Sequence, residues 1–305
     1  MVDRSADVQD PRAGPAVRVE PASRLVRALL AAEVERLRIG GHQVGEDPFR
    51  GLYITDEEVD RLLGGPDEAA APGEAHLEIV AALADFVGSE PRLFWLRDRF
   101  GLSPGEAACL VLCWVSEVDS GVERLVAYAQ DDVTKRRPRV DLALRTLAPD
   151  LRQDALLSRA GPLRRWGLLK LHDEPGQVAT PPMARSIVVA ERVTAFLDGL
   201  GELAVELEQA GAQLHPGRTA GSAPLSAETV ARVRCRPGSF PPLVHGPDRE
   251  RLATAAALLV DDPPGAVLEV PVAALLAGEA GNSAADVLQL AVRESVLEGV
   301  GLFLT

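Results

Sequence analysis

The stretch PLRRWGLLKLHDEPGQVATPPMARSIVVAERVTAFL, residues 162–197, decides the fold of the central part of this chain. The three leucines within residues 168–171 predict a short strand, and the DEPG sequence that follows predicts a turn. Val178 begins the predicted return strand, and residues 190–197 predict a helix that closes the segment. The pattern therefore indicates a two-stranded hairpin between helices.

Upstream of the hairpin, the residues FGLSPGEAACLVLCWVSEVD (100–119) contain a strong signal for the start of a helix. Ser103 is an N-cap residue, Pro104 occupies the first helical position, and Glu106 stands three residues after the cap. Residues 107–115 are apolar nearly all round, which predicts a central, buried helix.

Further helices are predicted where apolar residues recur at helical spacing. They cover residues 77–87, 93–100, 122–129, 140–147 and 151–158. Several helices, a two-stranded hairpin and a closing helix together predict a mainly α, winged-helix-like domain over residues 74–198.

Two regions precede this domain. Residues 1–22 are polar, with three prolines and no apolar period, which predicts a disordered tail. Residues 23–73 predict a helical extension, with an amphipathic helix over residues 25–37 and a shorter one over residues 56–63.

After the central domain, residues 199–238 are expected to form a linker with one helical stretch at 203–210. Residues 239–305 then alternate strand and helix. Strands are predicted at 241–247, 266–272 and 300–305, and helices at 252–260 and 284–297. This order implies a parallel sheet with right-handed crossovers. We therefore expect a small, partial, P-loop-like α/β domain, as truncation would leave it.

A phosphate-binding turn would sit after the first strand of that domain. It requires small residues, whose N–H groups wrap the phosphates, and then a lysine and a hydroxyl residue. With Gly246 as the first glycine, Arg251 stands at the second glycine, and neither the lysine nor the hydroxyl follows. A role for Arg249 or Arg251 in place of the lysine is the alternative. The sequence favours a loop without nucleotide, so we expect no catalytic residue and no cofactor in this chain.

Basic residues gather in the central domain, where residues 121–170 hold 11 basic and 6 acidic side chains. One interpretation is a DNA-binding surface, with the helix at 140–147 in the major groove and the 170s wing on the backbone. The other is a protein-binding or solvated face, which we favour because the candidate helix offers few base-reading side chains. The candidate residues are Lys135, Arg136, Arg137, Arg139, Arg164 and Arg165.

The composition of the chain restricts the classes of partner and site that it can have. A net charge of −13 repels nucleic acid and anionic membrane overall. Three cysteines do not make a disulfide framework, and Cys109 and Cys113 are expected to be core residues rather than metal ligands. The first residues show no secretory signal, and the apolar run at 107–115 is too short for a membrane helix. We expect a cytoplasmic protein with protein partners, no metal and no membrane.

Four stretches of the sequence together carry a family resemblance. They are DPFRGLYITDEEVDRLL (47–63), FGLSPGEAACLVL (100–112), YAQDDVTKRRPRVDLALRTL (128–147) and PLRRWGLLKL (162–171). From about Ser23 to Thr305 the chain resembles the N-terminal half of the winged-helix AAA+ ATPases encoded with bacterial phage-tail-like contractile injection systems.

The resemblance implies a helical winged-helix region followed by a degenerate ATPase-like module, with an active module beyond it in the relatives. It implies a non-catalytic scaffold that helps to assemble or remodel the injection particle, with particle components or a second copy as partners. ATP and magnesium would belong to the full-length relatives. The chain could be a fragment of a longer protein or a standalone accessory protein, and the sequence leaves both interpretations open. The alternatives are a winged-helix DNA-binding protein and an ATPase that is active only with a missing C-terminal module.

Overall fold

The computed structural model describes residues 14–39, 74–147, 156–174, 179–215, 252, 254–256, 266–273 and 283–305. It divides into two compact units, Pro15–Gly199 and a second that contains Leu200–Thr305, and each is described by itself.

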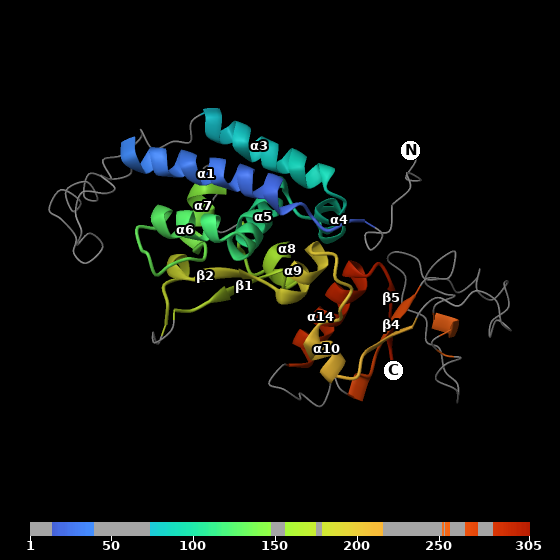
Figure 1. The fold of residues 1–305 in the computed structure, drawn as a ribbon. Helices are drawn as coiled ribbons and strands as arrows, with labels where there is room; N and C mark the ends of the chain where they lie inside the picture. The colour runs from blue at the N-terminus through green and yellow to red at the C-terminus, as the bar shows by residue number, and fades with distance from the viewer. Residues whose placement is uncertain are drawn as a thin grey trace. The chain divides into compact units, whose positions relative to one another are not determined.

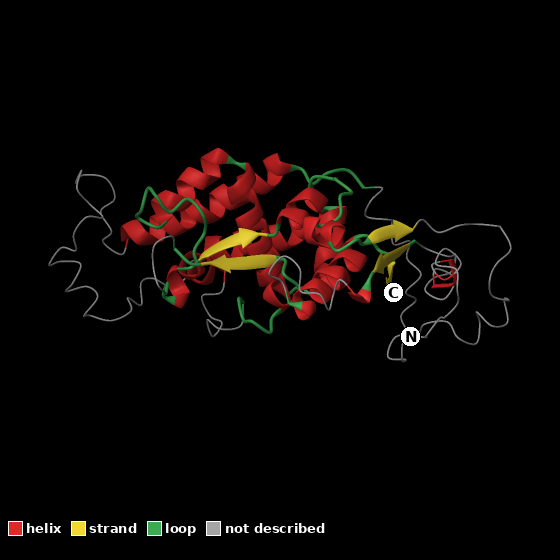
Figure 2. Ribbon diagram, turned by 90° about the horizontal axis from the view of Figure 1, so that it is seen from below, coloured by secondary structure: helices red, strands yellow, loops and turns green. Residues whose placement is uncertain are grey.

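The first unit is mainly helical and carries one small antiparallel sheet (Figures 1 and 2). Its elements are α1 (Val19–Ile39), α3 (Glu74–Ser89), α4 (Pro91–Phe100), α5 (Pro104–Val118), α6 (Ser120–Ala129), α7 (Val140–Leu147), α8 (Pro162–Arg165), β1 (Leu169–His172), the 3-10 helix η2 (Pro182–Ala184), β2 (Ser186–Val189) and α9 (Glu191–Leu197).

Helix α5 is the centre of this unit, as predicted. The Ser103 hydroxyl accepts from the backbone N–H of Glu106 at 3.3 Å, and the Glu106 carboxylate accepts from the backbone N–H of Ser103 at 2.8 Å. This capping box satisfies two backbone donors that the first turn leaves unpaired. Every residue from 106 to 116 is buried, because α1, α3, α6, α7 and β2 all pack on α5.

Helix α1 begins at Val19, so the prediction of a disordered tail up to residue 22 was wrong for its last residues. Pro21 stands in the first turn, where its missing N–H costs no helical hydrogen bond. Just before the helix, Val17 is buried, and its N–H donates to the Leu197 carbonyl at 2.8 Å. Helix α1 then lies beside α3 and also packs on α5 and α6 (Figure 1).

The predicted hairpin is present, but its return strand starts at Ser186 rather than Val178, which lies outside the described residues. Strands β1 and β2 pair in register Leu169↔Val189 (Figure 2). The alternation of half-buried and buried side chains in SIVV identifies this strand. An isolated antiparallel bridge also joins Arg139 to Ser186, so the chain just before α7 lies against β2.

The helix predicted at 151–158 was wrong in its described part. Leu156 and Leu157 are in a turn, and a second turn follows in which the Ser158 carbonyl accepts from the Gly161 N–H at 3.0 Å. A short helix that was not predicted, α8, follows with Pro162 at its first position. Both leucines are buried in the first turn. Their apolar character therefore reflects burial, which periodicity alone had interpreted as a helix.

The second unit contains α10 (Val205–Gln209), β3 (Gln213–His215), β4 (Val267–Val270), α14 (Ala284–Leu297) and β5 (Gly301–Leu304). The strand order is β3-β4-β5. Strands β4 and β5 are parallel and are joined through α14, as predicted, but β3 is antiparallel to β4, so the described sheet is mixed. An all-parallel, P-loop-like sheet is therefore not established.

Three further sequence predictions concern this unit. The stretch expected to be a linker supplies α10 and β3, because Leu207 and Ala212 join a buried core with Leu268 and Val270 of β4. The strand predicted at 241–247 lies outside the described residues. The helix predicted at 252–260 is described only at residues 252 and 254–256, which are helical.

Candidate interaction surface

The basic residues singled out from the sequence begin in a loop between α6 and α7 that one buried side chain holds in place. The amide of Gln130 donates to the backbone carbonyls of Lys135 at 2.7 Å and Arg137 at 3.0 Å. Its oxygen accepts from the Arg139 N–H at 2.8 Å. Residues 131–139 are called the braced loop below, because three hydrogen bonds from one buried amide fix their backbone.

The start of the braced loop is fixed as well. Asp131 has φ 52°, a left-handed conformation that only a few per cent of non-glycine residues adopt. The Asp132 carboxylate accepts from the Thr134 N–H at 2.9 Å and from its hydroxyl at 2.6 Å. Partial burial raises the pKa of Asp132, but these hydrogen bonds outweigh it, so the pKa lies below its usual value.

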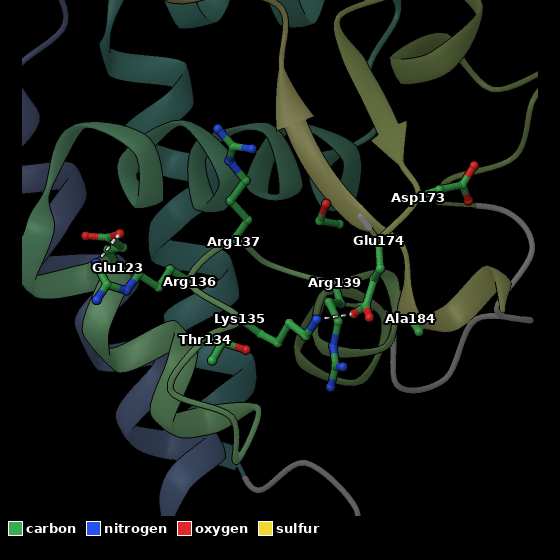
Figure 3. A pocket seen from close by; sticks show the side chains of 10 residues that line it. Glu123, Thr134, Lys135, Arg136, Arg137, Arg139, Asp173, Glu174 and Ala184 are labelled. Carbon is green, nitrogen blue, oxygen red and sulfur yellow. Dashed lines mark ion pairs between the residues drawn. The ribbon is translucent and has the colours of Figure 1, made fainter. Parts of the chain in front are cut away.

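The braced loop forms one wall of an open cavity of about 340 Å³ (Figure 3). The opposite wall comes from the end of β1 and from the region of η2 and β2. The lining residues are Glu123, Thr134, Lys135, Arg136, Arg137, Arg139, Asp173, Glu174, Ala184 and Ser186. Four of the six predicted basic residues thus meet at one cavity, whose chemistry is polar rather than that of an apolar small-molecule pocket.

Most of these cations already face a carboxylate. Lys135 Nζ lies 2.7 Å from the Glu174 carboxylate, and Arg136 lies 3.5 Å from Glu123, as the dashed lines in Figure 3 mark. Arg139 lies 3.5 Å from an oxygen of Asp141. Sequence reasoning missed Glu123 and Glu174 as counter-ions and Gln130 as the brace, because nothing in the spacing of these residues predicts their contacts.

Arg137 differs from its neighbours. Among the residues that the structure describes, it has no ion-pair partner, and its side chain is exposed. Its charge acts at longer range on Glu117. Burial raises the pKa of Glu117, while the hydrogen bond from the Val189 N–H, 3.0 Å long, and the charge of Arg137 lower it by less.

The structure does not bring Arg164 and Arg165 to this cavity. Arg164 donates to the Leu157 carbonyl at 3.3 Å, and the Arg165 guanidinium lies over the Trp166 ring, 5.1 Å from its centre. They occupy α8, the helix that directly precedes the hairpin. The six basic residues therefore do not form one patch.

Helix α7, considered from its sequence as a reader of the major groove, has no exposed residue. Its two half-buried side chains, Asp141 and Arg145, pair with each other at 2.9 Å. Arg145 also lies 2.6 Å from the carboxylate of Glu33 in α1, which is fully buried. A helix covered in this way cannot present side chains to base edges, so the major-groove interpretation of α7 was wrong.

The two cysteines of α5 lie in the core, as predicted. Cys109 and Cys113 are both fully buried, and the interaction between them, together with burial, raises the pKa of the Cys113 thiol. Within the described residues, no three His, Cys, Asp or Glu side chains are grouped as a metal site requires. The predicted nucleotide-loop residues Gly246, Arg249 and Arg251 lie outside the described residues.

The second unit contains a charge contact that the sequence did not suggest. His215 on β3 lies 2.6 Å from the Glu269 carboxylate, whose side chain is fully buried in the central strand β4. A buried carboxylate must be hydrogen-bonded to be tolerated, and this contact supplies one partner. It ties β3 to β4.

Comparison with known families gives one result, which covers most of the first unit and the first residues of the second. Residues 74–210 match the winged helix domain, variant. The match starts at the first residue of α3, includes the hairpin and ends just past α10, which agrees with the winged-helix-like region predicted from the sequence. No curated protein and no solved structure matches the chain. No helix in the described part of the chain combines the length and apolar character that crossing a membrane requires.

Proposed function

We propose that the helical unit is a protein-interaction module without catalysis of its own. We further propose that it serves an AAA+ ATPase of a contractile injection system, in the assembly or remodelling of the phage-tail-like particle. Its partners would be particle components or a second copy of the chain, and it would need no nucleotide.

The shielding of α7 is the observation that carries the interaction role. A winged-helix fold reads DNA through an exposed helix, but α7 is packed under α1 and its only half-buried polar groups are engaged in ion pairs. The cations of the braced loop are mostly paired with carboxylates, and the whole chain carries −13. A nucleic-acid backbone, which carries a charge at every step, gains little from such a surface, whereas a protein partner can place acidic and neutral residues to match its mixed charges.

The assignment to an injection system has a different basis. It rests on the four sequence stretches that resemble the N-terminal half of those ATPases, three of which lie in the winged-helix region. The interaction role does not depend on this assignment and would survive its failure.

Co-sedimentation of the purified chain with purified contractile particles tests the proposal, with and without MgATP, alongside analytical ultracentrifugation of the chain alone. We expect association with the particle or with itself that MgATP does not change. Absence of both associations would overturn the interaction role, and micromolar, magnesium-dependent binding of ATP would overturn the non-catalytic assignment.

Nucleic-acid binding is the second candidate, and one observation favours it. Residues 156–172, which include α8 and β1, hold four basic residues and no acidic one. Arg159, Arg165 and Lys170 of this stretch are exposed. A gel shift with duplex DNA over a salt series decides, because phosphate contacts weaken steeply with salt. No shift at low salt would exclude this candidate.

A further inference from the structure

From the geometry of the braced loop we infer the chemistry of its partner, an inference that rests on the proposed interaction role. The cavity beside this loop docks an acidic peptide segment of a partner protein. Carboxylates of the peptide bind the exposed guanidinium groups of Arg136 and Arg137, and an apolar side chain of the peptide packs against Val133.

The first argument is that the loop is built to hold one shape. Gln130 is only 7% exposed, and all three of its side-chain hydrogen bonds go to the loop backbone. Asp131 adopts a backbone conformation that a non-glycine residue keeps only where its surroundings impose it. A surface that is ordered before binding loses less conformational entropy when a partner binds, so this loop suits recognition.

The second argument is that the cations of this cavity hold carboxylates already. The contacts Lys135–Glu174 and Arg136–Glu123 show the geometry that a peptide carboxylate would use. The Arg136 pair is 3.5 Å long and its Arg side chain is 64% exposed, so it contributes little and yields readily to a competitor. Arg137 has no ion-pair partner among the described residues. It can therefore bind a carboxylate of the peptide without breaking an existing ion pair.

The third argument is apolar. Val133 is 82% exposed, the highest value among the large hydrophobic side chains that the structure describes as exposed. It is the third residue of the braced loop, where the backbone holds it out of the core. Neither Val133 nor Met183 of η2, which is 40% exposed, lines the cavity itself, but each directly precedes a lining residue, Thr134 and Ala184. Exposed apolar side chains beside cations match a segment that combines acidic and apolar residues.

The same cavity disfavours a phosphate backbone. Glu123, Asp173 and Glu174 line it, so a duplex with a charge every ~1.7 Å along its axis would bring phosphates against carboxylates. A peptide can place two or three carboxylates on the guanidinium groups and keep neutral residues beside the acidic ones. The mixed lining therefore selects a peptide over a nucleic acid.

The test uses the full chain and a fluorescein-labelled twelve-residue peptide of alternating Glu and Leu, followed by fluorescence anisotropy at 50 and 200 mM salt. A peptide with Gln in place of Glu is the ligand control, and a labelled duplex DNA is the competing macromolecule. We expect saturable binding of the acidic peptide, weaker at the higher salt, and none of the Gln peptide. The double variant Arg136→Glu/Arg137→Glu should weaken binding by at least about tenfold, and Val133→Ser by about threefold.

Arg159→Glu and Arg165→Glu together form the matched control, because they make the same charge change at exposed residues outside the cavity, and they should leave the affinity within about twofold. No peptide binding up to about 1 mM, equal losses in both double variants, or duplex binding that the cavity variant alone abolishes would each overturn the inference. If particle association persists while peptide binding is absent, this inference fails alone. If both are absent, the proposed function fails with it.

Discussion

The buried carboxylate of Glu33 offers the sharpest test of how α1 belongs to the helical unit. Its side chain is fully buried and accepts from Arg36 at 2.8 and 2.9 Å and from Arg145 at 2.6 Å. Arg145 also binds Asp141 and the Ala129 carbonyl, so Glu33 connects α1 to α7 and, through Arg145, to α6. The substitution Glu33→Gln keeps the volume and removes the charge.

The magnitude follows from these contacts. Removing one partner of a buried ion pair costs about 3–5 kcal/mol, and a hydrogen bond to a charged group is worth about 1.5–3 kcal/mol. Arg36 and Arg145 are 26% and 29% exposed, and Arg145 keeps its bond to Asp141, so part of the loss is recovered from water and that neighbour. We expect a loss of about 2–3 kcal/mol in the free energy of unfolding. For a unit of this size that lowers Tm by roughly 4–12 °C.

Urea and thermal denaturation followed by circular dichroism measure the loss, with Glu35→Gln as the matched control on the same helix. Glu35 is 62% exposed and its contact with Arg38 is 3.6 Å long, so this variant should stay within about 0.5 kcal/mol of the wild type. A double-mutant cycle with Arg145→Met should give a coupling energy of at least about 1 kcal/mol. Equal stabilities of the two Gln variants would refute the packing argument for α1.

Three further outcomes are expected. Asp119→Ala should cost about 1–2 kcal/mol in urea denaturation, because Asp119 caps α6 through the N–H groups of Gly121 and Val122. The hydrogen bond from Arg27 lowers the pKa of Asp119. The stability that the Asp119 carboxylate contributes is therefore full above its unfolded pKa and should vanish as pH falls through its folded pKa. A stability loss in Asp119→Ala that stays constant in acid would contradict this assignment. Glu117→Gln should raise Tm slightly at neutral pH, because partial burial raises the pKa of the carboxyl and its charged form therefore opposes folding. The gain should shrink as pH falls through that raised pKa, and a gain that grows in acid would contradict this sign. In the folded protein, Cys113 should resist alkylation by iodoacetamide at pH 8, because it is buried and the pKa of its thiol is raised. Mass spectrometry of native and urea-treated samples measures the difference in labelling. Rapid labelling of the native protein would argue against a buried thiol.

The candidate interaction surface shows how far sequence reasoning reaches. Local charge density placed Lys135, Arg136, Arg137 and Arg139 in one candidate surface, and the structure places all four at one cavity. The same reasoning added Arg164 and Arg165, which do not line this cavity. The first four lie together because a short loop keeps its residues close in space. Chain proximity cannot decide between groups separated by a whole helix.

The sequence alone determined those elements whose signals are local. The capping box at Ser103 and Glu106 fixed the start of α5, and the helices at 140–147 and 284–297 follow directly from apolar periodicity. Only the tertiary structure decided that α7 is shielded, that β3 pairs antiparallel to β4, and that a single glutamine braces the basic loop. These features arise from contacts between residues distant in the chain, or from the particular hydrogen bonds that one side chain makes. Neither kind of contact produces a periodic pattern or a motif in the sequence, because many residue types can make it. The folded backbone determines which residues come into contact.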